Sequence, residues 1–360
     1  MGVGDRAHHL LLLGSEIYFY NLRVSVNLVI PKEFLIKFIL LVFISGLSVT
    51  TVCAGALNVD VIAMFPKNTA EFAYADLKEA RQFPWYAQFK SQTLPVRFSD
   101  LEHFLASAGV DDNSQIEELA WSLTSGDSAS GPDDKAAPDS GNVLGVALGN
   151  FDPEAAKSFM KAHKIHGIDY RGYTLYPCAS CDDLSVVFID SSTVAFGHLR
   201  LLQQLVEVRV AADDSLMQNE KMFPLISQVN GRGIFWGVLN PGGTHQALQQ
   251  IVPEATLFPQ AGKLLNKLQA MVISIQGTGD LDVHFQLISS SPDDGALISQ
   301  LLQAGILFRQ FDARNSDPDL ATLLRSVRVV PNGEGLEVSF AVTSDQFVSL
   351  IKRNTFSAKR

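Results

Sequence analysis

The 360-residue chain has only three cysteines and lacks the common sequence signatures of catalysis. The nucleophile pattern G-x-S-x-G, the zinc-protease pattern H-E-x-x-H and the Walker-type phosphate loop are all missing. Because these patterns are missing, the sequence predicts no catalytic residue and no cofactor. A serine–histidine–aspartate site assembled from distant residues would leave no pattern of this kind.

Positive charge is also scarce. Lysine and arginine together number 28 against 38 aspartates and glutamates, a formal net charge of −10, and the basic residues form no cluster. A phosphate backbone repels such a chain, which argues against nucleic acid as a partner. Hydrophobic residues make up 47% of the chain, which excludes overall disorder.

Long apolar runs are absent except for one near the start. Lys32 and Lys37 come before or at the beginning of this run, and it ends in the small residues Ala54-Gly55-Ala56. A charged region, an apolar region and an A-x-A ending are the parts of a secretory signal. Residues 1–56 are therefore predicted to be a leader that makes the protein secreted or periplasmic.

Two questions about this leader stay open. The apolar count almost reaches the roughly 20 residues that a spanning helix needs, so residues 34–56 could instead remain as a membrane anchor. Residues 1–31 are either an extended charged region or an untranslated stretch before a downstream start. The rest of the chain has no second apolar run of this length.

Beyond the leader only Cys178 and Cys181 remain. Outside the cytosol such an isolated pair predicts a disulfide, with a redox-active pair as the alternative. His163 and His166 precede them at a spacing that resembles a zinc site. A strand over 168–176 would hold the histidines and cysteines about 30 Å apart at about 3.3 Å per residue. The sequence therefore predicts no metal site.

Four aromatic residues surround Pro84, and they allow two interpretations. The residues are Phe83, Trp85, Tyr86 and Phe89. Either they form a core-facing amphipathic segment, or they form an apolar binding surface for a lipid-like or peptide ligand.

Hydrophobic periodicity predicts alternating helices and strands in two halves. Strands are expected at 71–77, 116–124, 143–151, 168–176, 184–190 and 193–197 in the first half, and at 233–239, 271–277, 281–289, 325–331 and 335–342 in the second. Helices are expected at 79–92, 99–108, 152–163, 198–209, 244–252, 260–269, 291–304 and 343–352. The helix at 99 is placed by the capping-box pattern Ser99-Asp100-Leu101-Glu102.

These elements predict an α+β fold of two similar halves, residues 57–210 and 211–356. Each half has the order β-α-α-β-β-α-β-β-α, with an antiparallel sheet and helices packed on one face. The similar order suggests an internal duplication. Residues 125–142 have almost no large apolar side chains and are predicted to be a flexible insertion at a hairpin tip. The pattern does not choose between two sheets that meet and one sheet joined edge to edge.

Residues 65–81, FPKNTAEFAYADLKEAR, resemble the start of secreted bacterial proteins of unknown function. In those proteins a Pro-x-x-Thr turn leads into a strand that ends in Asp-Leu. The resemblance covers under a tenth of the chain and brings no catalytic residues. What it implies is a bacterial, exported protein.

The sequence thus favours an exported binding or scaffolding protein of the bacterial envelope. The alternatives are a carrier of an apolar, lipid-like ligand and a thiol–disulfide or other enzyme that uses Cys178 and Cys181. The expected partner is a protein or an apolar small molecule. A membrane would be contacted only through the N-terminal segment, if that segment is not cleaved.

Overall fold

The computed structural model describes residues 56–107, 116–124, 143–178, 181, 183–251, 259–277 and 280–352. All of them belong to one compact unit. The expected leader, apart from Ala56, and the expected insertion 125–142 lie outside the described residues.

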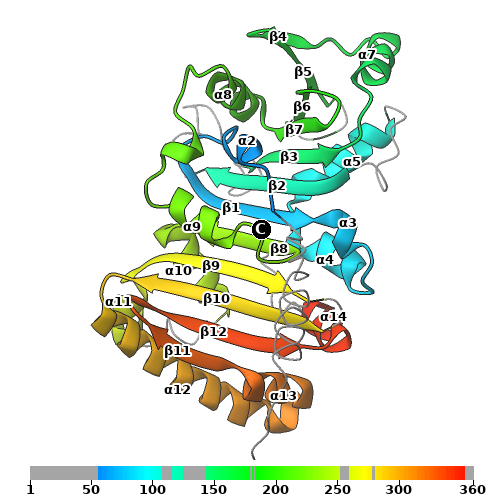
Figure 1. Cartoon of the computed structure of the whole chain (residues 1–360). Helices are drawn as coiled ribbons and strands as arrows, with labels where there is room; N and C mark the ends of the chain where they lie inside the picture. Colours follow the sequence, from blue (N-terminus) through cyan, green and yellow to red (C-terminus); the bar gives the residue numbers. More distant parts are fainter. Residues whose placement is uncertain are drawn as a thin grey trace, which may run out of the picture. The chain divides into compact units, whose positions relative to one another are not determined.

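Twelve strands of the described part form one sheet, in the order β11-β12-β10-β9-β8-β1-β2-β3-β7-β6-β5-β4 (Figure 1). Every pairing is antiparallel. The strands are β1 (Thr69–Asp76), β2 (Ile116–Thr124), β3 (Val143–Gly149), β4 (Ile168–Tyr170), β5 (Tyr173–Pro177), β6 (Ser185–Phe188), β7 (Thr193–Gly197), β8 (Phe235–Leu239), β9 (Leu268–Gln276), β10 (Leu281–Ser289), β11 (Arg328–Asn332) and β12 (Gly335–Val342).

Helices connect most of these strands. They are α2 (Val59–Ile62), α3 (Leu77–Ala80), α4 (Tyr86–Thr93), α5 (Val96–Ser107), α7 (Pro153–Ala162), α8 (Leu199–Arg209), η1 (Leu216–Gln218), α9 (Phe223–Val229), α10 (Pro241–Ile251), α11 (Pro259–Leu265), α12 (Pro292–Ser316), α13 (Pro318–Ser326) and α14 (Ser344–Lys352). The α+β class predicted from the sequence is confirmed. Among the helices in these ranges, none is both long enough and apolar enough to cross a membrane.

A single strand pair, β1 with β8, joins the two halves of the sheet. Tyr74 lies opposite Trp236 in this pair, and Phe72 lies opposite Val238. The sheet is therefore continuous and joined edge to edge. Outward from this pair the strand order is β1-β2-β3-β7-β6-β5-β4 on one side and β8-β9-β10-β12-β11 on the other. The first five strands of each side follow the same order, which is compatible with an internal duplication; the duplication stays a prediction.

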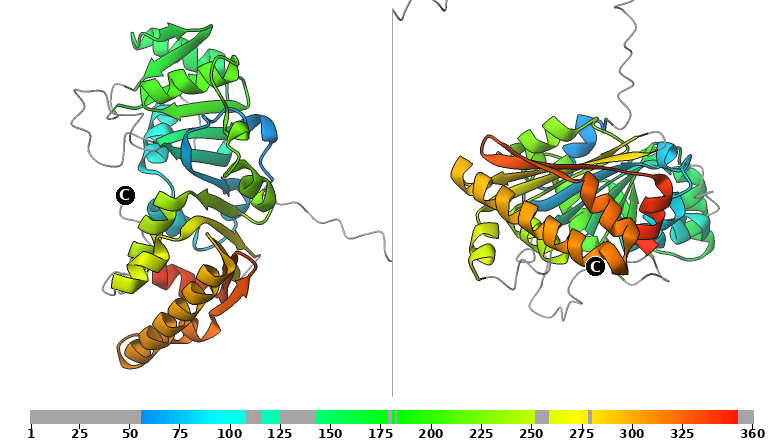
Figure 2. Two further views of the ribbon diagram at one scale, coloured as in Figure 1. Left: turned by 90° about the vertical axis from the view of Figure 1, so that its left-hand side faces the viewer. Right: turned by 90° about the horizontal axis from the view of Figure 1, so that it is seen from below.

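The two faces of the sheet are covered differently along its length. Alternate residues of β1 point to opposite faces, so that Phe72 and Tyr74 join one core and Ala75 joins another. Helices α2, α8 and α9 pack on the first face, whereas α3, α4, α5 and the helices from α10 to α14 pack on the second. Figure 2 shows α12 and α14 on one side of the sheet and α2 on the other.

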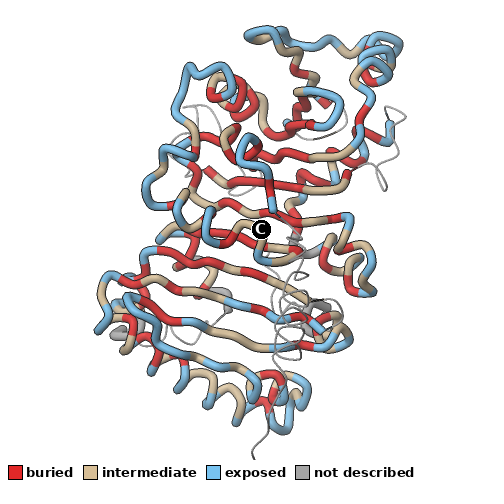
Figure 3. The backbone as a smooth tube through the Cα atoms, viewed as in Figure 1, coloured by how far each residue is buried: buried red, intermediate tan, exposed pale blue. Residues whose placement is uncertain are grey.

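The expectation of helices on one face therefore describes only the far end of the second half. There the polar residues Asp282, His284 and Glu337 of β10 and β12 are exposed on the face that no helix covers. In the first half β2, β3, β6 and β7 are mostly buried on both faces, as the red strands of Figure 3 show, whereas β4 at the outer edge is mostly exposed. Strands that are apolar on both sides, such as Ser185–Phe188, need this double cover.

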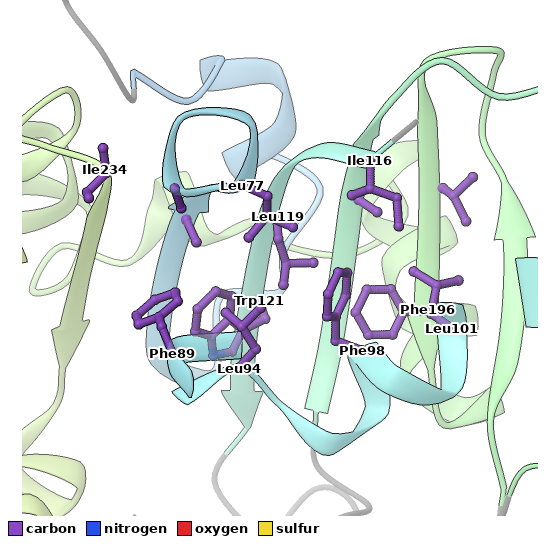
Figure 4. Packing of buried hydrophobic residues seen from close by; sticks show 14 of the residues in the cluster. Leu77, Phe89, Leu94, Phe98, Leu101, Ile116, Leu119, Trp121, Phe196 and Ile234 are labelled. Carbon is purple, nitrogen blue, oxygen red and sulfur yellow. The ribbon is translucent and has the colours of Figure 1, made fainter. Parts of the chain in front are cut away.

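The core of the first half is built on aromatic side chains that cross from strand to helix. Phe196 of β7 is fully buried, and the centroid of its ring lies 6.5 Å from that of Phe98 in α5. Figure 4 shows the two rings side by side, between Ile116 and Leu101. The pairing of β3 with β7 places Gly145 directly opposite Phe196, so the ring has room above the sheet.

The strand expected at 168–176 is wrong: the segment is a hairpin. β4 and β5 pair antiparallel through Ile168 and Leu175, and the chain turns at Arg171 and Gly172. Both turn residues have positive φ, 49° and 87°. Two consecutive positive-φ residues match the right-handed twist of the flanking strands in a tight hairpin.

The helix start expected at Ser99 is also wrong, because α5 already begins at Val96. Pro95 precedes it, and the Phe98 N–H donates to the Pro95 carbonyl. Glu102 does not lie at the third position of the helix. Its carboxylate forms an ion pair with Lys90 of α4 at 2.5 Å, which ties the two helices together.

The helix expected to end at Ala304 continues to Ser316. In the structure a Cβ on Gly305 would meet no atom within 4 Å, so the glycine is an ordinary helical residue that lowers helix propensity without breaking the helix. α12 and α13 therefore fill a stretch for which the sequence pattern predicted no element.

Candidate functional site

The structure joins Cys178 and Cys181 in a disulfide just after β5, with their Cα atoms 5.3 Å apart. Cys178 is buried in the core, and Cys181 is half-buried against α5, where its Sγ lies 3.8 Å from the Asp100 carbonyl oxygen. The bond thus closes the turn after β5 on itself, and Cys181 places that turn against α5.

The histidines are separate from any metal-binding cluster. His163 ends α7; its Nδ1 lies 2.9 Å from the Phe159 carbonyl oxygen, and its ring lies over that of Phe159. His166 is exposed. The expected 30 Å separation from the cysteines fails, because β4 and β5 fold back on each other. Even so, the disulfide occupies both sulfurs, and within the described ranges no three His, Cys, Asp or Glu side chains gather as possible metal ligands.

The four aromatic residues around Pro84 come together beside α14. Phe83 stacks on Trp85 with 5.2 Å between ring centroids, and Phe89 and Phe347 meet Trp85 edge-on. Trp85 and Phe89 are buried, whereas Phe83 and Tyr86 are half-buried at the margin of the same core. Only the outer two can therefore contact a partner without a rearrangement.

A small apolar hollow lies next to Trp85, lined also by Phe89, Phe235, Ile275 and Phe347. The Trp85 indole N–H is buried and has no hydrogen-bond partner within the described part of the chain. Ligand cavities usually have about 300–1,000 Å³. The surrounding atoms leave no space here for even a water molecule. The hollow is therefore a packing defect of the core in this conformation.

Two titratable groups with raised pKa values form a pair beside the β1–β8 junction. The Tyr74 hydroxyl donates a hydrogen bond of 3.0 Å to a Glu118 carboxylate oxygen. Burial is the main reason why the pKa of Glu118 lies above its ordinary 4.5; the Tyr74 hydrogen bond opposes this shift and nearby Asp76 adds to it. Burial and the Glu118 charge likewise raise the pKa of Tyr74. The pair is an internal acid–phenol contact within the sheet.

This pair gives a pH-dependent prediction. Because the folded-state pKa of Glu118 is raised, the folded protein binds this proton more tightly than the unfolded chain does. The resulting stabilisation is complete below pH 4.5 and is lost as the pH rises through the raised pKa. Glu118→Gln, whose amide oxygen still accepts from Tyr74, should therefore gain stability relative to the wild type as the pH rises. Urea unfolding of both proteins from pH 4.5 to 7.5 measures this, and a pH-independent difference would contradict it.

The most unusual surface of the described chain lies on α12. This helix runs along the β11 end of the sheet and is the outermost element there (Figures 1 and 2). Its inner side, with Ile298, Leu302 and Ala313 buried, packs against the sheet and α13. Gln303 donates a hydrogen bond of 3.0 Å to the Val329 carbonyl oxygen of β11, which covers part of the sheet edge.

The outer side of α12 is also apolar. Leu297, Leu307, Phe308 and Phe311 are exposed by 49%, 64%, 69% and 71%. These are four of the ten large apolar side chains that are exposed in the described ranges. At 3.6 residues per turn, Leu297, Leu301, Ala304, Phe308 and Phe311 follow one side of the helix, with Leu307 beside them. We call these six residues the α12 stripe.

Polar residues border this stripe. Asp293 and Asp294 lie in the first turn, and Asp312 and Arg314 lie near the C-terminal end. The Arg314 guanidinium carbon lies 5.7 Å from the centroid of the Phe311 ring. Sequence reasoning missed this surface because it ended the helix at Ala304. The repeat at positions 297, 301, 304, 308 and 311 was the available signal.

No protein-family model and no curated protein matches the chain. Among solved structures, the chain is similar to TP0453, a Treponema protein. For crystal form I the TM-score is 0.47 at 10% identity, covering 82% of this chain and 97% of that one. For crystal form III it is 0.47 at 11% identity, covering 81% and 97%.

Proposed function

We propose that this chain is an exported binding or scaffolding protein of the bacterial envelope, and that it binds other protein through the α12 stripe. The observation that carries the proposal is the exposure of Leu307, Phe308 and Phe311 on a helix that is already packed on its other side. An exposed apolar patch bordered by polar residues is typical of an interaction surface.

The energy available at this surface is large enough for specific binding. Fully burying one leucine or phenylalanine side chain stabilises a complex by about 1.5–3 kcal/mol. Three such side chains are more than half exposed here. Burial of these side chains by a partner therefore contributes several kcal/mol of favourable binding free energy, which is partly offset by the entropic cost of association.

The charges along α12 favour a protein over a bilayer as the partner. Helices that lie on membrane surfaces carry many lysines and arginines on their polar side. α12 has no lysine and only two arginines, Arg309 and Arg314, against three aspartates. The chain as a whole has a net charge of −10, which anionic lipids would repel.

Export is supported by the leader pattern at 34–56 and by the Cys178–Cys181 disulfide, since such bonds persist in oxidising compartments. Export and location in the envelope remain part of the proposal.

The test is to fix complexes by chemical cross-linking in the producing bacterium, which also captures weak and reversible assemblies, and to separate them by gel electrophoresis. The wild-type protein should migrate as an assembly larger than one chain. Leu307→Ser/Phe308→Ser/Phe311→Ser should reduce that assembly at least tenfold, because the three changes remove most of the apolar contact area. Val96→Ser is the matched control, since Val96 is 66% exposed but stands apart on α5. A wild-type protein that migrates only as a monomer would overturn the proposal.

A further inference from the structure

We infer that the partner of the α12 stripe is a second copy of the same chain, with the two α12 helices packed antiparallel about a two-fold axis at Ala304. This inference rests on the proposed function and names its partner. Its basis is that the α12 stripe is self-complementary.

Four of the other five stripe residues are placed symmetrically about Ala304, and the fifth, Phe308, would face Gln300 of the partner subunit. Leu297 and Phe311 lie seven residues on either side of it, and Leu301 and Leu307 lie three residues on either side. In an antiparallel pair with its axis at Ala304, Leu297 would face Phe311 of the partner subunit. A two-fold interface uses the same patch on both copies and so requires this kind of internal symmetry.

The charges at the two ends of the stripe are complementary. Asp293 lies eleven residues before Ala304, and Arg314 lies ten residues after it. Antiparallel packing therefore brings Asp293 in the first turn of one helix to Arg314 of the partner subunit. Parallel packing would place like charges together, which is unfavourable. Antiparallel packing also aligns the helix dipoles favourably.

The middle of the stripe permits close approach. Ala304 is exposed, and Gly305 beside it has open space where a Cβ would lie. Packed helices have axes about 8–10 Å apart, and small residues at the crossing point allow the shorter distances. The bulky residues at Leu297 and Phe311 can then pack together at both ends.

The size of the contact sets the expected affinity. A helix of 25 residues is about 37 Å long and 10 Å wide, so one helix pair buries less than the roughly 800 Å² per partner found in tight complexes. We expect a dissociation constant of roughly 1–100 µM, in the range of weak, reversible interfaces.

The first test is sedimentation of the purified protein between 1 and 200 µM. The wild type should change from monomer to dimer over this range. Phe308→Glu should weaken the dimer more than 30-fold, because it places two like charges close to the axis. Val96→Glu is the matched control and should leave the dimer unchanged. Circular dichroism of each variant checks that it folds.

Cysteine cross-linking tests the orientation, with copper–phenanthroline as oxidant and Cys53→Ser as background. Ala304→Cys should cross-link to itself, because it lies on the axis. Leu297→Cys should cross-link when mixed with Phe311→Cys but not alone, since two copies of position 297 lie about 21 Å apart in this pairing.

Any one of three results would overturn the inference. The first is a monomer at every concentration, the second is efficient self-cross-linking of Leu297→Cys alone, and the third is a dimer that persists in both Phe308→Glu and Ala304→Glu.

Vesicles of neutral and anionic lipid give a further check, since binding that depends on Phe308 would assign the stripe to a bilayer instead. If the purified protein is a monomer while the cellular assembly still requires Leu307, Phe308 and Phe311, then the partner is a different protein and the proposed function stands. If neither assembly exists, both fail.

Discussion

Replacing Trp236 with alanine is expected to lower the free energy of unfolding by about 3–5 kcal/mol. Trp236 is fully buried at the one strand pair that joins the two halves of the sheet. Its ring stacks on Tyr74 with 5.4 Å between centroids and lies 5.7 Å from the ring of Phe72. Removing it leaves a cavity in the core between the sheet and helices α2 and α9, and the hydrogen-bonded strands beneath it cannot shift far enough to fill that cavity.

Loss of this size is large against the 5–15 kcal/mol that stabilises most domains. Because Trp236 belongs to β8 while Tyr74 belongs to β1, its removal should also weaken the coupling between the halves. Denaturant unfolding followed by fluorescence and by circular dichroism measures both effects, and the two probes should separate in the variant. Trp236→Phe keeps an aromatic ring and should lose less than half as much. A Trp236→Ala protein within 1 kcal/mol of the wild type would refute this account of the junction.

Replacing Gly145 with alanine is expected to destabilise the protein by about 1–3 kcal/mol, although glycine-to-alanine changes in many positions stabilise. A Cβ at this position would lie 2.1 Å from Cζ of Phe196 and 2.3 Å from its Cε1. Phe196 has no free space to turn into, because it is fully buried beside Phe98. The added methyl group must therefore displace the ring or bend β3.

A double-mutant cycle identifies the clash as the cause. Gly145→Ala should cost less in a Phe196→Leu background, because the shorter side chain no longer covers position 145. Gly262→Ala is the matched control, since a Cβ there meets nothing within 4 Å in helix α11, and it should leave stability unchanged or raise it by up to about 1 kcal/mol. Equal effects of Gly145→Ala in both backgrounds would show that the ring is not the obstacle.

Much of the secondary structure could be predicted because its signals are local. The Asp152 carboxylate caps α7 by accepting from the N–H groups of Glu154 and Ala155, as the Asp-Pro-Glu start predicts. The hairpin of β9 and β10 follows from two alternating segments separated by glycines. The errors at Ser99 and in 168–176 came from local signals that tertiary contacts outweigh: Glu102 is paired with Lys90, and the turn at Arg171 requires positive φ from a non-glycine residue.

The candidate site could not be predicted in the same way. α12 carries apolar residues on two sides, and periodicity alone does not say which side packs on the sheet. Only the neighbouring strands decide that Ile298 and Leu302 are inside and that Phe308 and Phe311 are outside. The aromatic residues around Trp85 show the opposite case. Their composition is compatible with an exposed binding surface. In the structure, however, Trp85 and Phe89 are buried, and Phe347 of α14, from the far end of the chain, packs edge-on against Trp85.

The amino-acid sequence by itself determined the α+β class, the hairpins of β2 with β3, β9 with β10 and β11 with β12, and the bond between two cysteines three residues apart, because each depends on residues close together along the chain. The tertiary structure alone decided that β1 and β8 join the halves into one sheet and that one side of α12 is left uncovered. Strand edges present the same backbone N–H and C=O groups whatever their side chains, so the choice of a distant partner depends on how the whole chain packs.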